Sequence, residues 1–318
     1  MQAVAILGGL GSQMFKYAFY LQIKSKDEAY IDVLPYQLTS MWNGYELNKI
    51  FGIDSLELAG NISAEKVKKY ISQGESYKEA GAAMLQELSP KKPVISIFRG
   101  YLYPQKRHKI LYFYSLVYNK IKRFIYHNND TQDTIPFICK TKWFSFYFDE
   151  INHVSDKYIG KGTKREELKK VFQFPDFKDS KNTEIAERMQ TNESVALHVR
   201  RSDHMYDNAE LFKSQYFAKA VNYIKKLVKS PVFYIFSDES EWCRNHLDEL
   251  GLLEEDKIEI IDWNKAEQSY RDMQLMTYCK HNILAISSFS WWGYYLSNRR
   301  DKVVCAPKGY WLEVPVHF

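Results

Sequence analysis

The sequence is poor in the residues that build disulfide frameworks and structural metal sites. Its 318 residues include four cysteines, and no two of them form a C-x-x-C pair or a zinc-ligand spacing. We therefore expect free thiols in a reducing compartment and no cysteine-based metal site. The cysteines are Cys139, Cys243, Cys279 and Cys305.

Long apolar runs are also missing. No stretch reaches the roughly 18 apolar residues that a membrane-spanning helix needs. Residues 1–7 show neither the charged region nor the cleavage site of a signal peptide, so we expect a cytoplasmic protein. Hydrophobic residues still make up 45% of the chain, which supports a sizeable core and excludes a disordered protein.

Acidic residues are absent from one long segment. None occurs between Glu87 and Asp130, whereas basic and aromatic residues mix throughout residues 104–129. Two interpretations stay open, namely peripheral contact with the inner face of a membrane and a helix with a solvated basic face. The net charge of +5 is too small to indicate a nucleic-acid partner, but it suits an anionic ligand.

Short apolar runs alternate with helical periodicity along most of the chain. A strand at 3–7, a glycine turn at 8–11, a helix at 13–24 and a strand at 29–33 form a βαβ unit, which predicts a parallel sheet. The alternation restarts after a polar stretch at 175–192, which we interpret as the domain junction. The strands expected after that stretch are 194–199, 232–236, 258–261, 282–286 and 303–305.

This pattern predicts an α/β protein with two Rossmann-like, doubly wound domains that face each other across a cleft, the preferred place for ligands. The first domain covers residues 1–180 and includes a helical, basic-aromatic segment at about 60–145. The second domain covers residues 190–318.

Charged residues cluster where a strand of the second domain ends, in His198-Val199-Arg200-Arg201-Ser202-Asp203. Burying such charges without partners costs several kcal/mol each. Guanidinium groups bind phosphate oxygens through bidentate, charge-assisted hydrogen bonds. These six residues alone leave a phosphate site and a structural ion-pair network equally open.

Polar residues follow other expected strands at the same edge of the sheet. Ser287 and Ser288 stand at a helix start, where they either cap the helix or help to bind a phosphate. Asp238 can accept two hydrogen bonds from a guanine edge or cap the next helix. Taken together, these features are typical of a nucleoside-diphosphate site. The turn at 8–11 with Asp32 imitates a dinucleotide fingerprint, but its G-x-G-x-x-G spacing fails, so an NAD-dependent enzyme remains only a rival hypothesis.

Four motifs together resemble the α-1,2-fucosyltransferases of glycosyltransferase family 11. They are GGLGSQMFKYAF at 8–19, HVRRSD at 198–203, FSDE at 236–239 and SSFSWWGYYL at 287–296. The shorter pieces Tyr45-Glu46-Leu47 and DMQLM at 272–276 also fit the family pattern. No motif of the family covers residues 60–145.

The resemblance implies a GT-B-like fold and a bacterial-type, inverting enzyme. It implies transfer of L-fucose from GDP-β-L-fucose to the 2-hydroxyl of a terminal β-galactoside, on an oligosaccharide or a surface-polysaccharide precursor. The alternatives are another fucosyl linkage (α-1,6 or protein O-linked) and a non-catalytic protein that binds nucleotide sugars or glycans. The expected partners are GDP-fucose and a galactose-terminated glycan, without any cofactor.

The resemblance also implies roles for single residues. Arg200 binds the β-phosphate and stabilises the leaving diphosphate, while His198 and Asp238 read the guanosine. The residues expected to close over the phosphates are Ser287, Ser288 and Phe289. The residues expected to face the donor sugar and the acceptor are Gly9, Gly11, Ser12 and Gln13.

Two positions depart from the family pattern, which has Asn where this chain has Ser12 and commonly Asn where it has Ile286. A serine hydroxyl is shorter than an amide and has fewer donors, so a contact to donor or acceptor is lost or bridged by water. Ile286 is interpreted as part of a strand core.

The expected mechanism needs no metal, because no D-x-D motif lies at a strand end and Arg200 with a helix start can stabilise the leaving group. The candidate bases are Asp203 and Asp207, with His204 as a further candidate. The leaving phosphate itself could instead take the proton, since the transition state is oxocarbenium-like. Arg201 is expected to turn back into the domain and pair with a carboxylate.

Overall fold

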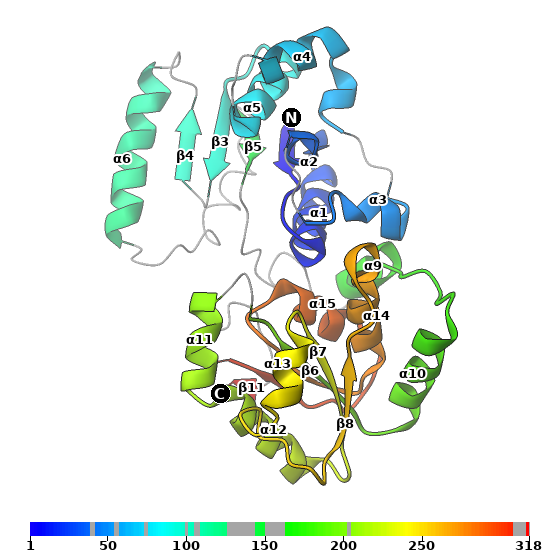
Figure 1. Cartoon of the computed structure of the whole chain (residues 1–318). Helices are drawn as coiled ribbons and strands as arrows, with labels where there is room; N and C mark the ends of the chain where they lie inside the picture. Colours follow the sequence, from blue (N-terminus) through cyan, green and yellow to red (C-terminus); the bar gives the residue numbers. More distant parts are fainter. Residues whose placement is uncertain are drawn as a thin grey trace. The chain divides into compact units, whose positions relative to one another are not determined.

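The computed structural model describes residues 1–38, 42–53, 57–72, 76–98, 101–104, 109–125, 144–149, 163–201, 205–307 and 316–317. The chain divides into two compact units, Met1–Gln173 and Phe174–Phe318 (Figure 1). The polar stretch at 175–192, interpreted above as a domain junction, contains helix α10 (Ser180–Thr191). This helix packs its buried Ile185, Ala186 and Met189 into the core of the second unit, so the stretch belongs to that unit.

The first unit contains a five-stranded sheet in the order β2-β1-β5-β3-β4. Its pairs are parallel except for β3 with β4, which run antiparallel. The predicted βαβ opening is therefore confirmed, whereas the central strand β5 lies in a part of the chain where no strand was predicted. The strands are β1 (Gln2–Ala5), β2 (Ala29–Asp32), β3 (Val94–Phe98), β4 (Tyr101–Pro104) and β5 (Ser145–Phe148).

Helix α5 (Tyr77–Leu88) covers one face of this sheet. A capping box starts it, in which Ser76 and Glu79 bond reciprocally to each other's backbone. Gly81 allows the ring of Tyr147 to pack against the helix, because a Cβ at this position would lie 2.4 Å from that ring. The other helices are α1 (Leu10–Lys24), α2 (Leu34–Leu38), α3 (Glu46–Phe51), α4 (Ala64–Ser72), α6 (Lys109–Ile125) and α9 (Thr163–Val171).

The second unit contains a six-stranded sheet in the order β11-β10-β9-β6-β7-β8, and all of its pairs are parallel. Counted along the chain, this is the order 3-2-1-4-5-6 of dinucleotide-binding domains, which reverses direction between β6 and β9. The strands are β6 (Ser194–Val199), β7 (Val232–Ser237), β8 (Lys257–Ile261), β9 (His281–Ile283), β10 (Val304–Ala306) and β11 (Val316–His317).

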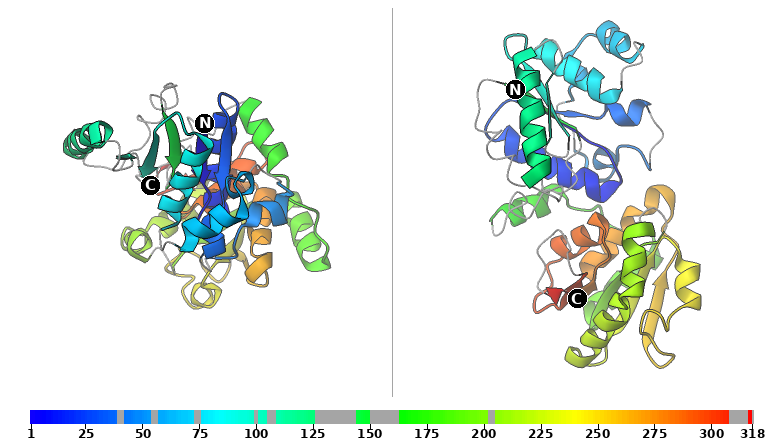
Figure 2. Two further views of the ribbon diagram at one scale, coloured as in Figure 1. Left: turned by 90° about the horizontal axis from the view of Figure 1, so that it is seen from above. Right: turned by 90° about the vertical axis from the view of Figure 1, so that its left-hand side faces the viewer.

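Helices cover both faces of this second sheet (Figures 1 and 2). Val195 and Leu197 of β6 face a core that includes α12 (Tyr216–Leu227), while Ala196 faces a core that includes α10 and α14 (Tyr270–Tyr278). Burial of both faces confirms the predicted doubly wound unit. The remaining helices are α11 (Met205–Lys213), α13 (Ser240–Asn245) and α15 (Ser288–Leu296).

The predicted end of one strand in this unit is wrong. Strand β9 ends at Ile283 and not at Ile286, because the chain turns where Ser287 N–H donates to Ala285 O at 2.8 Å. Ile286 nevertheless packs against the core of this unit, in agreement with its expected role.

The described residues provide no long apolar helix and no metal-binding cluster. None of their helices has the length and hydropathy to cross a bilayer. No group of three His, Cys, Asp or Glu among them could hold a metal ion. Three cysteines in this part of the chain are buried free thiols, Cys243, Cys279 and Cys305, while Cys139 lies outside the described residues.

Candidate functional site

The point where the strand order of the second sheet reverses lies between β6 and β9. In open α/β sheets, ligands bind at such a switch point, outside the carboxyl ends of the strands. Strand β6 leads there into Arg200 and Arg201, and β9 leads into Ser287 and α15. The fold therefore brings the two strongest sequence motifs of this domain to one edge of one sheet.

Helix α15 presents its amino terminus at this edge. Ser287 is its N-cap, and the Ser287 hydroxyl accepts a hydrogen bond from Phe289 N–H at 3.2 Å. Trp291 and Trp292 are fully buried, and Gly293 lies so close to α14 that a Cβ would come within 2.7 Å of Met276. This packing fixes the helix, whose free N–H groups and dipole favour an anion at its amino terminus.

Arg200 is held by the acidic residue that follows β7. Its Nε lies 3.4 Å from Asp238 Oδ2, and 29% of the arginine side chain is exposed against 14% of the aspartate. The second oxygen of Asp238, Oδ1, accepts from Arg201 N–H at 3.1 Å. Asp238 thus positions Arg200 and its loop, a role that the sequence does not predict. The expected reading of guanosine by this carboxylate stays a prediction.

Arg201 points in a different direction from its neighbour. Its Nε donates to Glu239 Oε2 at 2.9 Å, and its guanidinium lies 3.8 Å from the ring centroid of Trp242. Trp242 in turn stacks on His246 at 4.4 Å. The expectation that Arg201 turns back and pairs with a carboxylate is confirmed, so this arginine anchors the loop.

His198 and Phe289 come together from the two sides of the switch point. His198 is buried near the end of β6, and its ring centroid lies 5.9 Å from that of Phe289 in α15. Two residues assigned to donor binding on sequence grounds are thus neighbours in the fold.

The glycine turn of the first unit is shaped by Gln13. Gly8 has a φ of +95°, a conformation that favours glycine. The buried Gln13 amide donates to Gly8 O at 3.0 Å and Gly44 O at 2.9 Å, and it accepts from Glu46 N–H at 2.9 Å. Both donors of this amide are engaged within the protein. Gln13 therefore positions the turn, and its expected contact with the donor or acceptor stays a prediction.

Glu46 is a buried acidic residue next to Gln13 to which sequence reasoning assigned no role. Its buried carboxylate accepts from the backbone N–H of Leu10 in the first turn of α1, and Asn43 Nδ2 lies 3.3 Å away. Burial raises the pKa of this carboxyl above its ordinary value. The side chain caps α1 from another segment, a long-range contact for which the sequence offers no signal beyond the short Tyr45-Glu46-Leu47 motif.

The other predicted site residues have these positions. Gly9 immediately precedes α1, whose first turns contain Gly11 and Ser12, and Ser12 N–H donates to Gly9 O at 2.9 Å. Ser288 is the first residue of α15. Asp203 and His204 lie outside the described residues, and Asp207 lies within α11, in a part where the backbone alone is described.

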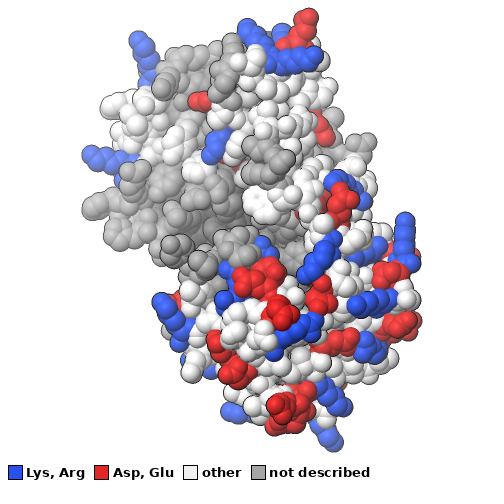
Figure 3. All heavy atoms as spheres, in the orientation of Figure 1, with Lys and Arg blue, Asp and Glu red and all other residues white. Residues whose placement is uncertain are grey.

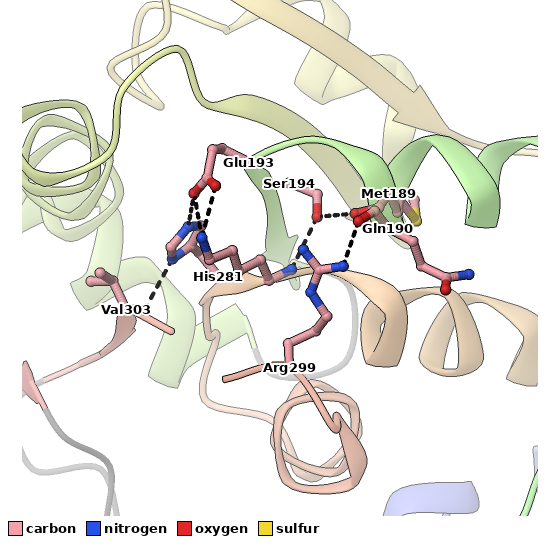
Figure 4. Close-up of polar contacts among 8 residues, drawn as sticks. Met189, Gln190, Glu193, Ser194, His281, Arg299 and Val303 are labelled. Carbon is pink, nitrogen blue, oxygen red and sulfur yellow. Dashed lines mark hydrogen bonds and ion pairs between the residues drawn. The ribbon is translucent and has the colours of Figure 1, made fainter. Parts of the chain in front are cut away.

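A second charged cluster lies at the opposite, amino-terminal edge of the same sheet (Figure 4). Glu193 pairs with Lys280 Nζ at 2.7 and 2.9 Å and with His281 Nε2 at 3.0 Å. His281 Nδ1 accepts from Val303 N–H at 3.0 Å, so in the neutral ring Nε2 carries the proton. This cluster ties β6, β9 and the approach to β10 together, far along the strands from the switch point.

The sequence of the chain is similar to those of known proteins. A model of the family described as "Glycosyl transferase family 11" matches residues 1–311. The chain is 34% identical over 136 residues to an alpha-1,2-colitosyltransferase of Escherichia coli, which covers 41% of this chain and 45% of that protein. It is 32% identical over 120 residues to the O-antigen biosynthesis glycosyltransferase WbnK of Escherichia coli, which covers 36% and 38%. These alignments span less than half the length of either relative.

More distant similarity extends to an animal enzyme and to solved structures. Galactoside alpha-(1,2)-fucosyltransferase 1 of Ateles belzebuth is 27% identical over 145 residues, covering 42% of this chain and 38% of that protein. The NodZ alpha-1,6-fucosyltransferase soaked with GDP-fucose has a TM-score of 0.50 at 12% identity and covers 93% and 92% of the two chains. A variant of Arabidopsis thaliana FUT1 in complex with GDP has a TM-score of 0.50 at 10% identity and covers 97% and 71%. At such identities these structures show a shared fold alone.

Proposed function

The chain belongs to glycosyl transferase family 11, and from this premise we propose that it transfers L-fucose from GDP-β-L-fucose to the 2-hydroxyl of a terminal β-galactoside. The acceptor is an oligosaccharide or a surface-polysaccharide precursor, and the new linkage is α-1,2. One observation carries the proposal, namely that Arg200 and the amino terminus of α15 flank the switch point of the second sheet. A guanidinium and a helix amino terminus at that point suit a diphosphate.

The named relatives support the linkage and leave two donors to be compared. Two of them carry α-1,2 activity in their names, one as a fucosyltransferase and one as a colitosyltransferase. GDP-fucose is our primary donor. The 34% identity to the colitosyltransferase favours GDP-colitose as the second candidate.

In the proposed mechanism the departing diphosphate is stabilised by fixed charges. As the bond from fucose to the β-phosphate breaks, negative charge grows on that phosphate, where Arg200 and the N–H groups of α15 meet it. Asp238 keeps the Arg200 guanidinium in place through the 3.4 Å contact. Attack by the acceptor hydroxyl from the opposite face inverts the anomeric carbon. The proton passes to Asp203, to Asp207 or to the leaving phosphate, and no metal is required.

We also propose a GT-B-like arrangement in which the second unit binds the donor and the first unit faces the acceptor across a cleft. Support comes from the largely parallel sheet of the first unit, from the parallel sheet of the second, and from the fold shared with the NodZ fucosyltransferase. The proposed compartment is the cytoplasm. The buried free thiols of Cys243, Cys279 and Cys305 support a reducing environment.

Nucleotide binding and GDP release test this function against its alternatives. Thermal unfolding should shift upward with GDP but not with NAD, because only a ligand of the folded state stabilises it. GDP release from GDP-fucose should depend on added lactose, which separates an enzyme from a non-catalytic binder. A shift with NAD alone, or GDP binding without turnover on any β-galactoside, would contradict the proposal.

A further inference from the structure

Helix α6 exposes apolar side chains along its outward face. Phe113 and Tyr114 are 64% and 66% exposed, and Leu116 and Val117 are exposed as well. Phe113, Leu116 and Val117 recur at spacings of three and four, so they form one stripe. Apolar residues of an amphipathic helix normally face the core, and here they face outward.

The inward face of α6 explains this inversion. Asn119 donates to Leu102 O at 2.8 Å and accepts from Leu102 N–H at 2.9 Å. Its side-chain amide thus pairs with the backbone of β4, which is the edge strand of the first sheet. Ser115, on the same side, is buried. These polar groups attach the helix to the strand, and the exposed Phe113 and Val117 lie on the other side of the helix by helical spacing.

Positive charge accompanies the stripe. Lys109 and Lys120 are exposed, stand at either end of it, and lie on the same side of the helix as Phe113 by helical spacing. The sequence contains no acidic residue between Glu87 and Asp130. Figure 3 shows basic and uncharged atoms, and no acidic ones, at the edge of the first unit where α6 lies.

We propose that this stripe and its two lysines dock the protein on an anionic lipid surface, with α6 lying in the plane of the headgroups. Aromatic and aliphatic side chains between lysines are the composition of interfacial helices. Each lysine close to an anionic surface strengthens binding about fivefold. The 17 residues of α6 span about 25 Å along the surface. The positive charges of the two lysines favour phosphate headgroups. A protein partner would need acidic side chains placed opposite both lysines.

Vesicle flotation of the full chain tests this inference. The wild-type protein should float with vesicles that contain phosphatidylglycerol and remain at the bottom with phosphatidylcholine alone. Phe113→Ser with Leu116→Ser should abolish flotation. Lys109→Gln with Lys120→Gln should lower the partition coefficient roughly 30-fold and weaken its dependence on salt. The matched control is Leu253→Ser, which changes an exposed leucine of the second unit and should float like wild type.

Three outcomes would overturn the inference. They are no flotation of the wild type, equal flotation with both lipids, and wild-type flotation of the Phe113→Ser, Leu116→Ser variant. Sedimentation without lipid tests whether a second copy of the chain occupies the stripe. If the wild type is a dimer and this variant is not, the stripe is an interface between copies. Thermal unfolding of each variant, expected near wild type because the residues are exposed, shows that the fold is retained.

Discussion

Arg200 is the residue on which the proposed chemistry depends most. Replacing it with alanine removes the guanidinium beside the leaving phosphate and should lower kcat about 10²- to 10³-fold. Arg244→Ala provides the matched control, because Arg244 forms surface ion pairs with Glu241 and Asp262. Steady-state kinetics with GDP-fucose and lactose measure both variants. Wild-type turnover in Arg200→Ala would remove the central residue assignment.

Asp238 has two separable roles, and a pair of nucleotides distinguishes them. If the carboxylate reads the exocyclic amine of guanine, the wild type should prefer GDP to IDP, which lacks this amine. Asp238→Asn should then reduce that preference roughly tenfold, the value of a hydrogen bond to a charged group. Calorimetric titration with both nucleotides measures it. An equal loss of affinity for both would mean that Asp238 acts by holding Arg200 alone.

The residues that the sequence identified and those it missed differ in the range of their contacts. Arg200, Ser287 and Asp238 were predictable because each follows a buried strand, a pattern visible in a few neighbouring residues. The internal contacts of Gln13 and Glu46 were not predictable because they join residues 31 to 33 positions apart, between α1 and the segment around Gly44. No local pattern distinguishes such a buried clamp from a ligand-binding amide.

Secondary-structure elements were likewise predictable where the sequence pattern is local, and not where the element depends on pairing with distant segments. Strands β6 and β7 were predicted well, because each is a largely apolar run of six residues and the polar turns beside it are clear. Strand β5 is a run of four residues, Ser145–Phe148, buried on both faces, so it lacks the alternation that marks a half-buried strand. Its central place in the first sheet depends on pairing with β1 and β3, which lie far from it in sequence.

The Glu193–Lys280–His281 cluster makes the second sheet sensitive to acid. Burial lowers the pKa of His281 below its ordinary value of 6.5, so the ring is neutral in the folded protein. A proton on Nδ1 would also oppose Val303 N–H. The contribution of His281 to stability should therefore be complete above pH 6.5 and should decrease as the pH falls below it. Pairing with Lys280 and then His281 lowers the pKa of Glu193, whose own effect begins below its ordinary value of 4.5.

Urea unfolding at pH 7.5 and pH 5.5 measures this effect at pH values above those at which Glu193 titrates. The midpoint at pH 5.5, taken relative to that at pH 7.5, should be lower in the wild type than in His281→Gln, because the raised pKa values of Asp32 and Asp272 act equally in both proteins. His246→Gln changes a histidine that stacks on Trp242, outside this cluster, and should retain the pH difference of the wild type. A difference that persists unchanged in His281→Gln would assign the acid sensitivity to other groups.

At the scale of the whole molecule, we predict that the reaction does not require a metal ion. In the proposed mechanism Arg200 and α15 replace the charge that a divalent ion would supply, so treatment with EDTA should leave turnover unchanged. Added Mg²⁺ or Mn²⁺ should not raise the rate of the treated protein. A loss of activity that either ion restores would show that fixed protein charges are insufficient.

The fold of the two units could be predicted from the sequence, but the direction of helix α6 could not. Both α/β units were expected from the alternation of strands and helices, and the order of the second sheet then locates the site. The outward stripe of α6 was visible in the sequence only as a basic, aromatic segment. Its direction became evident from the Asn119 contact with β4, which no periodicity encodes.

The linkage made on a defined acceptor tests the central proposal most directly. The protein is incubated with GDP-fucose and lactose, and nuclear magnetic resonance identifies the product. We predict one fucosyl product, α-linked to the 2-hydroxyl of galactose, and no product from an acceptor with a 2-deoxygalactose terminus. A fucose attached to any other hydroxyl, or transfer to the 2-deoxy acceptor, would contradict the proposed function.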